Sequence, residues 1–244
     1  MSKILQGEIA KIEKRMLALS ARAEEALYRA IKAVETGDAA LAAQVIESDA
    51  EIDRLEVELE EEGLKILALH QPVAVDLRCL ISVLKINSDL ERIADLATTI
   101  AKQARVLVAR PRVELPFDLH AMASKAWSMV RDSLDSQVRL DAALARSVRA
   151  ADKDVDTMHQ SNTEGTLEAI RRNPAAADAY LAHLIVSRSL ERVADHAKSI
   201  AADVVYMLEG AIVRHGADTP AAGPAAGASS QGNGAPTPAT PSLG

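Results

Sequence analysis

The chain has 244 residues and a formal net charge of −7, and 48% of its residues are hydrophobic although only 2% are aromatic. Alanine, leucine, valine, isoleucine, glutamate and arginine dominate, which is typical of packed helices and unlike a β-sheet protein. The negative charge and the lack of a basic stripe or basic tail argue against nucleic acid as a main partner.

Cysteine content and apolar runs exclude further classes of protein. The single cysteine, Cys79, excludes an internal disulfide framework and a cysteine-based zinc site. Its apolar neighbours favour a buried core thiol over a nucleophile. The N-terminus carries no secretory signal, and no window approaches the roughly 20 uncharged apolar residues of a membrane span. We therefore expect a soluble, cytoplasmic protein without direct membrane insertion.

Apolar residues at helical spacing, interrupted by Gly and Pro, predict six long helices. In chain order they cover about 8–35, 38–69, 73–109, 117–140, 141–172 and 175–212, with linker prolines at 111 and 116. Asp38 and Asp141 are placed to cap the second and fifth helices. Asn173-Pro174 ends the fifth.

The fold class that follows is all-α, with two tandem, sequence-related three-helix bundles related by a pseudo-twofold repeat. We place the first bundle at 1–112 and the second at 113–215. Short connections within each unit predict antiparallel neighbouring helices. Residues 216–244 are rich in Ala, Gly and Pro without apolar periodicity, so a disordered tail is expected there.

An internal duplication carries the candidate site. Residues 90–95, LERIAD, return as LERVAD at 190–195, and the DAALA segment at Asp38 returns at Asp141. Each half holds two acid pairs at i, i+4, a spacing that stacks two carboxylates on one helix face. The eight residues are Asp49, Asp53, Glu91, Asp95, Asp152, Asp156, Glu191 and Asp195.

Spacing along the chain predicts that the four acids of each half meet. Asp53 precedes the turn at Gln71 by about 18 residues and Glu91 follows it by about 20, so in an antiparallel hairpin both stand at equal height. Four semi-buried carboxylates are costly unless they are protonated, neutralised by arginine or bound to metal. Arg92 and Arg192 each neighbour an acid and should point about 100° away, which disfavours arginine pairing.

The type of donor bears on which metal would bind. All-oxygen sites suit hard cations, so we expect Mg²⁺, Mn²⁺ or iron rather than zinc, with enough carboxylates to hold more than one ion in each half. His159 follows Asp156 at i+3, where the first half has Glu56. This histidine is either a nitrogen ligand that favours a transition metal or simply a rim residue.

Several motifs together resemble the PhoU family across about residues 5–215. They are PVAVDLR at 72–78, Lys85-Ile86, LERIAD at 90–95, ERVADH at 191–196 and DVVY at 203–206. The resemblance implies two metal-binding three-helix bundles, with the family's acidic metal motifs at the eight carboxylates named above.

In functional terms, the resemblance implies a cytoplasmic accessory protein and negative regulator of phosphate uptake. The partners implied are the ATPase subunit of the phosphate ABC importer and the phosphate-sensing histidine kinase, and we expect a homodimer. The tail is not a feature of the family.

Two classes of function remain. One is a regulator that acts by protein–protein binding, with metals as structural or signalling elements. The other is a carboxylate-bridged metalloenzyme of the di-iron type, for which Asp156-x-x-His159 is the only near match to the Glu-x-x-His motif. The sequence offers no nucleophile with a base partner and no phosphate-cradling glycine loop, so no catalytic residue is assigned and the regulator is favoured.

Overall fold

The computed structural model describes residues 3–213, and in that part of the chain six α-helices and one short 3-10 turn form without any β-strand. The elements are α1 (Lys3–Thr36), α2 (Ala39–His70), α3 (Ala74–Val108), α4 (Leu119–Arg139), α5 (Ala142–Arg172), the turn η1 (Pro174–Ala176) and α6 (Ala177–Glu209). The all-α prediction with six long helices is confirmed. The expected tail at 216–244 lies outside the described residues.

Local signals account for most of the helix boundaries. The Asp38 carboxylate accepts from the N–H groups of Ala40 and Leu41, and Asp141 does the same for the first turn of α5, so both predicted caps are present. The sixth helix was predicted to reach residue 212 and instead ends at Glu209. Gly210 adopts φ +72 there, a left-handed conformation that glycine accepts at little cost and that terminates a helix.

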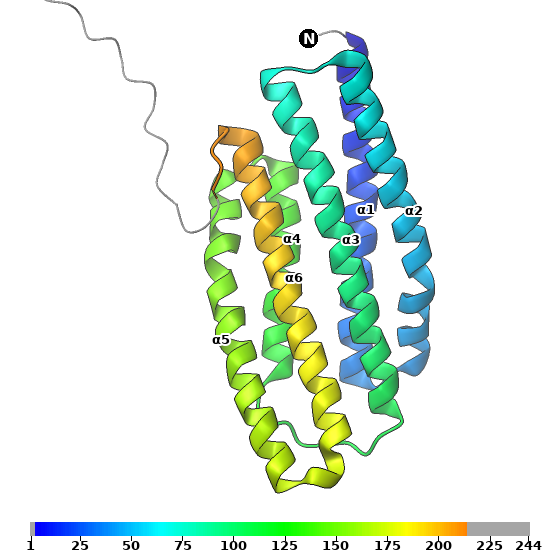
Figure 1. The fold of residues 1–244 in the computed structure, drawn as a ribbon, viewed down its shortest axis with the longest axis vertical. Coiled ribbons are helices and arrows are strands. Elements are labelled where there is room, and N and C mark those ends of the chain that lie inside the picture. Colours follow the sequence, from blue (N-terminus) through cyan, green and yellow to red (C-terminus); the bar gives the residue numbers. More distant parts are fainter. Residues whose placement is uncertain (1–2, 214–244) are drawn as a thin grey trace, which may run out of the picture.

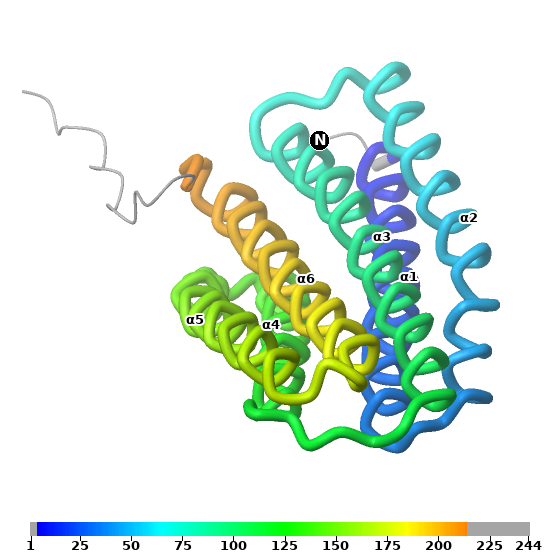
Figure 2. The backbone as a smooth tube through the Cα atoms, turned by 60° about the horizontal axis from the view of Figure 1, so that its bottom comes forward, coloured from blue at the N-terminus to red at the C-terminus, as the bar shows by residue number. Residues whose placement is uncertain are grey.

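The helices form two three-helix units, α1–α3 and α4–α6, in which sequential neighbours run antiparallel (Figure 1). The helices α3 and α6 lie next to each other in the middle, while α2 and α5 stand at the outer edges (Figures 1 and 2). The α2–α3 hairpin is tight at Gly63, where a Cβ would stand 2.5 Å from Leu84 Cδ2.

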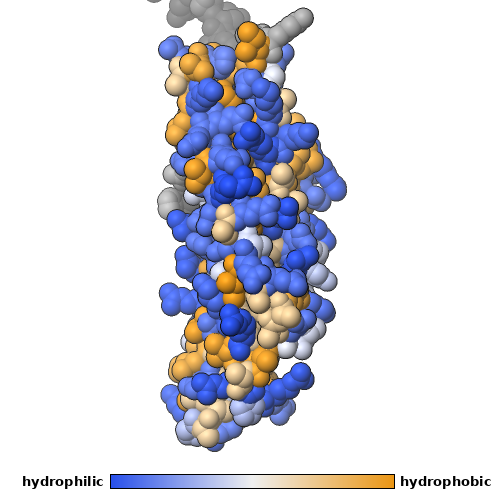
Figure 3. All heavy atoms as spheres, turned by 90° about the vertical axis from the view of Figure 1, so that its right-hand side faces the viewer, coloured by the Kyte–Doolittle hydropathy of each residue, from blue (hydrophilic) through white to orange (hydrophobic). Residues whose placement is uncertain are grey.

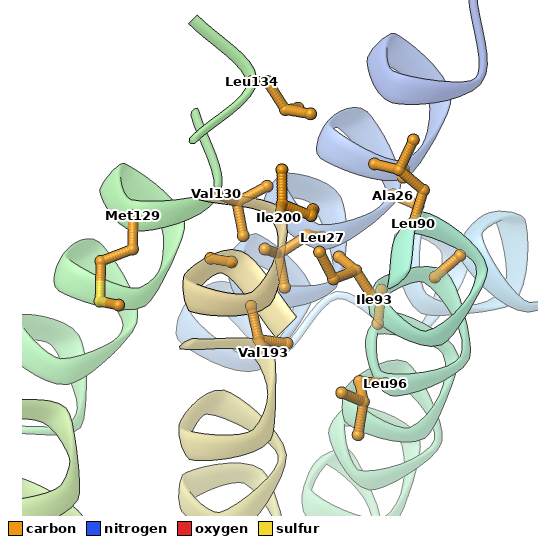
Figure 4. Packing of buried hydrophobic residues seen from close by; sticks show 14 of the residues in the cluster. Ala26, Leu27, Leu90, Ile93, Leu96, Met129, Val130, Leu134, Val193 and Ile200 are labelled. Atoms are coloured by element: carbon orange, nitrogen blue, oxygen red, sulfur yellow. The ribbon is translucent and has the colours of Figure 1, made fainter. Parts of the chain in front are cut away.

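The two units share one continuous hydrophobic core. The most extensive helix packing in the molecule joins α3 to α6. Two cross-unit pairs fix an antiparallel register: Lys85 Nζ lies 2.6 Å from Asp203 Oδ1, and His196 Nδ1 lies 2.8 Å from Asp89 Oδ1. In this register the two copies of the repeated LER motif cross. Their buried apolar side chains meet others from α1 and α4, as Figure 4 shows for Ile93, Val193, Leu27 and Val130.

The outer face of α2 is largely polar. Figure 3 shows this side of the molecule, where hydrophilic residues cover most of the surface and hydrophobic patches are separated from one another. Within residues 3–213, no helix combines the length and the apolar character needed to cross a bilayer.

Cys79 is half-buried on α3 and its Sγ lies 3.7 Å from Glu13 Oε1. Burial, with the neighbouring Glu13 carboxylate adding to it, raises the pKa of the thiol to about 11. The thiol is therefore protonated near neutral pH, as expected of a packing residue rather than a nucleophile.

Candidate functional site

In the first unit, the acids of α2 and α3 act on one another across the hairpin. Burial raises the pKa of Asp49, and the negative charges of Asp53 and Asp95 add to that effect, while a hydrogen bond with Thr98 opposes it. Burial also raises the pKa of Glu91, and the negative charge of Asp95 raises it further. The charge of Arg92 lowers it, while the acids of α2 add a smaller increase. The four predicted carboxylates thus share one electrostatic neighbourhood.

The second unit repeats this arrangement between α5 and α6. Burial raises the pKa of Glu191, and Asp195, Asp156 and Asp152 each raise it further. Burial likewise raises the pKa of Asp195, with Asp152 as the largest of its charged neighbours. The matched heights predicted from chain spacing therefore bring the acids of each hairpin into mutual range.

The two acid clusters lie along the edges of their hairpins rather than at the centre of the core. Asp152 is the only one of the eight that is fully buried, and Asp53, Asp156 and Asp195 are exposed. Over residues 3–213, no three side chains of His, Cys, Asp or Glu already stand together as a preformed metal site. Bringing three or four carboxylates onto one ion therefore requires rotamer changes.

Basic side chains pair with the acids, and here one sequence-based expectation is wrong. Arg92 does not point away from its neighbours: its Nε lies 3.2 Å from Glu91 Oε2 and its Nη1 lies 3.1 Å from Asp95 Oδ2. The long side chain lies along the helix surface and contacts acids on both sides of it in the chain. The angle between adjacent Cα–Cβ bonds does not predict where such a flexible side chain ends.

The second cluster has a different counter-ion, which the sequence analysis missed. Lys198 Nζ contacts Asp152 Oδ2 and lies 4.0 Å from Asp195 Oδ1. The hydrogen bond with Asp152 raises the pKa of this lysine. The spacing in the sequence could have indicated this pair, because Lys198 follows Asp195 at i+3 on α6 and so lies on the same helix face.

His159 contacts a serine. Its Nδ1 lies 3.0 Å from Ser187 Oγ, and burial, together with the charge of Arg188, lowers its pKa. In the first unit, Glu56 occupies the equivalent place and accepts a hydrogen bond from Asn87 Nδ2 at 3.1 Å. Both residues make a hydrogen bond to the facing helix, which favours a structural role at the rim of the acid cluster. The second ring nitrogen of His159 is left for any metal.

The residues present fit a metal ion of the hard type. The donors are carboxylate oxygens, and Asp152 Oδ1 is buried without a hydrogen-bond partner. A buried acceptor left unpaired is costly, and a cation would relieve that cost.

Comparison with known proteins identifies the family. A model of the PhoU domain matches residues 16–104 and matches again at 119–204, one copy in each three-helix unit. The chain belongs to the PhoU family. The duplicated acid pairs lie within the two matched segments.

Relatives agree over most of the chain. A protein of Pseudomonas putida named as a phosphate-specific transport system accessory protein PhoU homolog is 35% identical over 215 residues, covering 88% of this chain and 84% of the relative. The homolog 1 of Thermotoga maritima is 34% identical over 187 residues, covering 76% and 81%.

Solved PhoU structures share the fold. The crystal structure of PhoU from Pseudomonas aeruginosa has a TM-score of 0.81 at 35% identity and covers 84% of this chain and 99% of that one. The phosphate transport system regulatory protein PhoU from Streptococcus pneumoniae has a TM-score of 0.78 at 26% identity and covers 86% and 100%.

Proposed function

We propose that this PhoU-family protein is a metal-binding cytoplasmic accessory protein of phosphate transport that restrains phosphate uptake and phosphate-starvation signalling. The observation that carries the proposal is the match of both halves of the chain to the PhoU domain, together with the names of its relatives as phosphate-specific transport system accessory proteins. The protein acts by binding other proteins and has no turnover of its own.

Metal ions of the Mg²⁺, Mn²⁺ or iron type are held in each hairpin, by Asp49, Asp53, Glu91 and Asp95 in the first unit and by Asp152, Asp156, Glu191 and Asp195 in the second. The ions supply positive charge that balances carboxylates which repel one another. The raised pKa of Glu91, Glu191 and Asp195 supports this role, because it comes first from burial and then from the neighbouring carboxylates, and a bound cation would offset both. The alternative, a carboxylate-bridged metalloenzyme of the di-iron type, has the support of a single residue, His159.

The partners proposed are the ATPase subunit of the phosphate importer and the phosphate-sensing histidine kinase, with a second copy of the chain as a homodimer. Deleting the protein should derepress phosphate-starvation genes in phosphate-rich medium. Pull-down with each partner tests the binding directly. An oxygen-consumption assay of the iron-loaded protein tests the alternative, and robust turnover without partner binding would reverse the choice.

The metal role is tested by melting the protein with and without a chelator. We expect chelation to lower the melting temperature of the wild type, because bound metal stabilises only the folded state. Asp53→Ala should blunt this response. The matched control is Glu47→Ala on the same helix, which is exposed and should respond like the wild type. A melting curve that is unchanged by chelator would remove the metal from the proposal and leave the family assignment in place.

A further inference from the structure

A cavity of about 220 Å³ lies at the junction of the two units, and Leu115 of the linker that joins α3 to α4 contributes to its lining. Its wall is drawn from both units: α1 and the linker on one side, α4 and α6 on the other. Apolar side chains make up most of the lining, and they are Ile31, Val34, Leu115, Leu119, Ala123, Val186 and Leu190. The acid clusters contribute no residue to it.

The pseudo-twofold repeat shows that this space is not a requirement of the fold. The alignment of Asp38 with Asp141 pairs Leu119 with Met16, and Val34 with Gln137. Met16 and Gln137 are buried, and the Gln137 side-chain amide donates to Met16 Sδ at 3.6 Å. The same place in the other half is therefore filled by two packed side chains, whereas here the lining residues Val34 and Leu119 are only partly buried.

Few polar groups line the cavity. His183 is half-buried in the wall, and its Nδ1 is buried without a hydrogen-bond partner. In the repeat that aligns Glu91 with Glu191, the counterpart of His183 is Val83, which belongs to the core. Rotation about the Cβ–Cγ bond exchanges Nδ1 with Cδ2, so the imidazole can turn a nitrogen toward a bound molecule.

The mouth of the cavity carries a glutamate that is paired with two basic side chains. Glu35 Oε1 lies 2.5 Å from His120 Nδ1, and Lys32 Nζ lies 3.4 Å from the other Glu35 oxygen. The charges at the mouth are therefore matched to one another, and the rest of the lining is apolar apart from His183. This arrangement favours an uncharged occupant.

We propose that this cavity binds one small uncharged molecule with a compact apolar body and a single hydroxyl or N–H group, the apolar body against the aliphatic wall and the polar group on His183. The size fits, because a dry apolar cavity of about 150 Å³ is enough to hold benzene. A hydrogen bond to His183 satisfies a buried nitrogen that otherwise has no partner. The occupant touches α1, α4, α6 and the linker at once, so it couples the two units and extends the function proposed above.

The test uses the full chain and two probes of nearly equal shape, benzyl alcohol and ethylbenzene, followed by amide chemical shifts during titration. We expect saturable binding of one molecule, with the shifts centred on residues 119–123 and 183–190. Ala123→Leu fills the cavity from α4 and should weaken both probes at least about tenfold. His183→Phe removes the hydrogen bond and should weaken benzyl alcohol about three- to tenfold while ethylbenzene stays within about twofold.

Matched variants keep the result decisive. Ala150→Leu makes the same change on the exposed face of α5 and should leave both affinities unchanged. Leu119→Trp and His183→Leu replace the first two variants if either fails to fold. The proposal is overturned if neither probe saturates the wild type, if cavity filling leaves affinity unchanged, or if removal of the imidazole weakens the two probes equally.

Discussion

Asp152 is the most deeply buried of the eight candidate carboxylates, with 3% of its surface exposed. One of its oxygens meets the ammonium of Lys198, and the other has no hydrogen-bond partner. In the first unit, Arg92 spans Glu91 and Asp95, and the counterpart of Lys198 is Thr98, which bonds to Asp49. The two acid clusters therefore have carboxylates at equivalent positions. They differ in the basic side chains that a metal would have to displace.

Lys198→Met should raise the affinity of the second cluster for Mn²⁺ by about fivefold, since it removes a cation that competes for Asp152 and Asp195. Calorimetric titration of chelator-stripped protein measures the change. Lys153→Met, an exposed lysine of α5, is the control and should leave the affinity unaltered. An unchanged affinity in Lys198→Met would mean that metal does not use these carboxylates.

The raised pKa values of Glu91, Glu191 and Asp195 predict how stability depends on pH. Their folded carboxyls hold protons at a higher pH than the unfolded ones do, so metal-free folded protein binds more protons and gains stability as the pH falls. The gain in stability extends down toward the ordinary pKa values of 4.5 for Glu and 3.8 for Asp.

The urea midpoint of chelator-treated protein should accordingly rise as the pH falls below about 5.5, where free histidine is already protonated. Nearer to neutral pH, the lowered pKa values of His159 and His183 act in the opposite direction, because the unfolded imidazoles take up protons first. Glu191→Gln should flatten this rise, because one of the shifted groups is gone. Adding millimolar Mg²⁺ should stabilise the protein most at pH 7, where the carboxylates are ionised and free to bind it. A midpoint with the same pH dependence in the wild type and in Glu191→Gln below that pH would contradict the raised pKa values.

At the scale of elements, α2 and α5 both begin after an aspartate N-cap. The carboxylates of Asp38 and Asp141 each accept two hydrogen bonds from backbone N–H groups in the first turn of the helix that follows, with N···O distances of 2.9 Å. These bonds satisfy donors that the helix itself cannot, and they set where each long hairpin begins. The position of a cap in turn sets the height of every acid along its helix.

Asp38→Ala and Asp141→Ala should each lower the free energy of unfolding by about 1 kcal/mol. The two sites lie at the starts of different helices without a shared partner, so the double variant should lose the sum of the two effects. Urea unfolding at neutral pH measures this, with Glu164→Ala on the exposed face of α5 as the control. A loss below about 0.3 kcal/mol would mean that neither bond caps its helix in solution.

At the scale of the molecule, the repeated LER motif contributes both to the acid clusters and to the hydrophobic core. The acids at 91, 95, 191 and 195 face the hairpin clusters, while Leu90, Ile93, Leu190 and Val193 are fully buried in the core that joins the units. The helices α3 and α6 carry both sets of residues and pack directly on each other. The acid clusters and the junction of the units therefore lie on the same pair of helices.

Ile93→Ala should lower the free energy of unfolding by about 2–5 kcal/mol, because it leaves a cavity at this junction. Hydrogen exchange should then rise in α4–α6 as well as in α1–α3, since the two units share one core. Val57→Ala, at a residue that is 49% exposed on α2, is the control. Faster exchange confined to α1–α3 would show that the units unfold independently.

The sequence by itself determined the number of helices, two of their caps and the matched heights of the acid pairs along each hairpin, because these follow from local periodicity and from a fixed rise per residue. It did not determine that α3 and α6 pack antiparallel into one core, that Arg92 bends back onto Glu91, or that Lys198 holds Asp152. Those outcomes depend on contacts between helices far apart in the chain and on the reach of flexible side chains. The cavity at His183 is of the same kind, because only the tertiary packing decides which of two related places in a repeat is filled and which stays open.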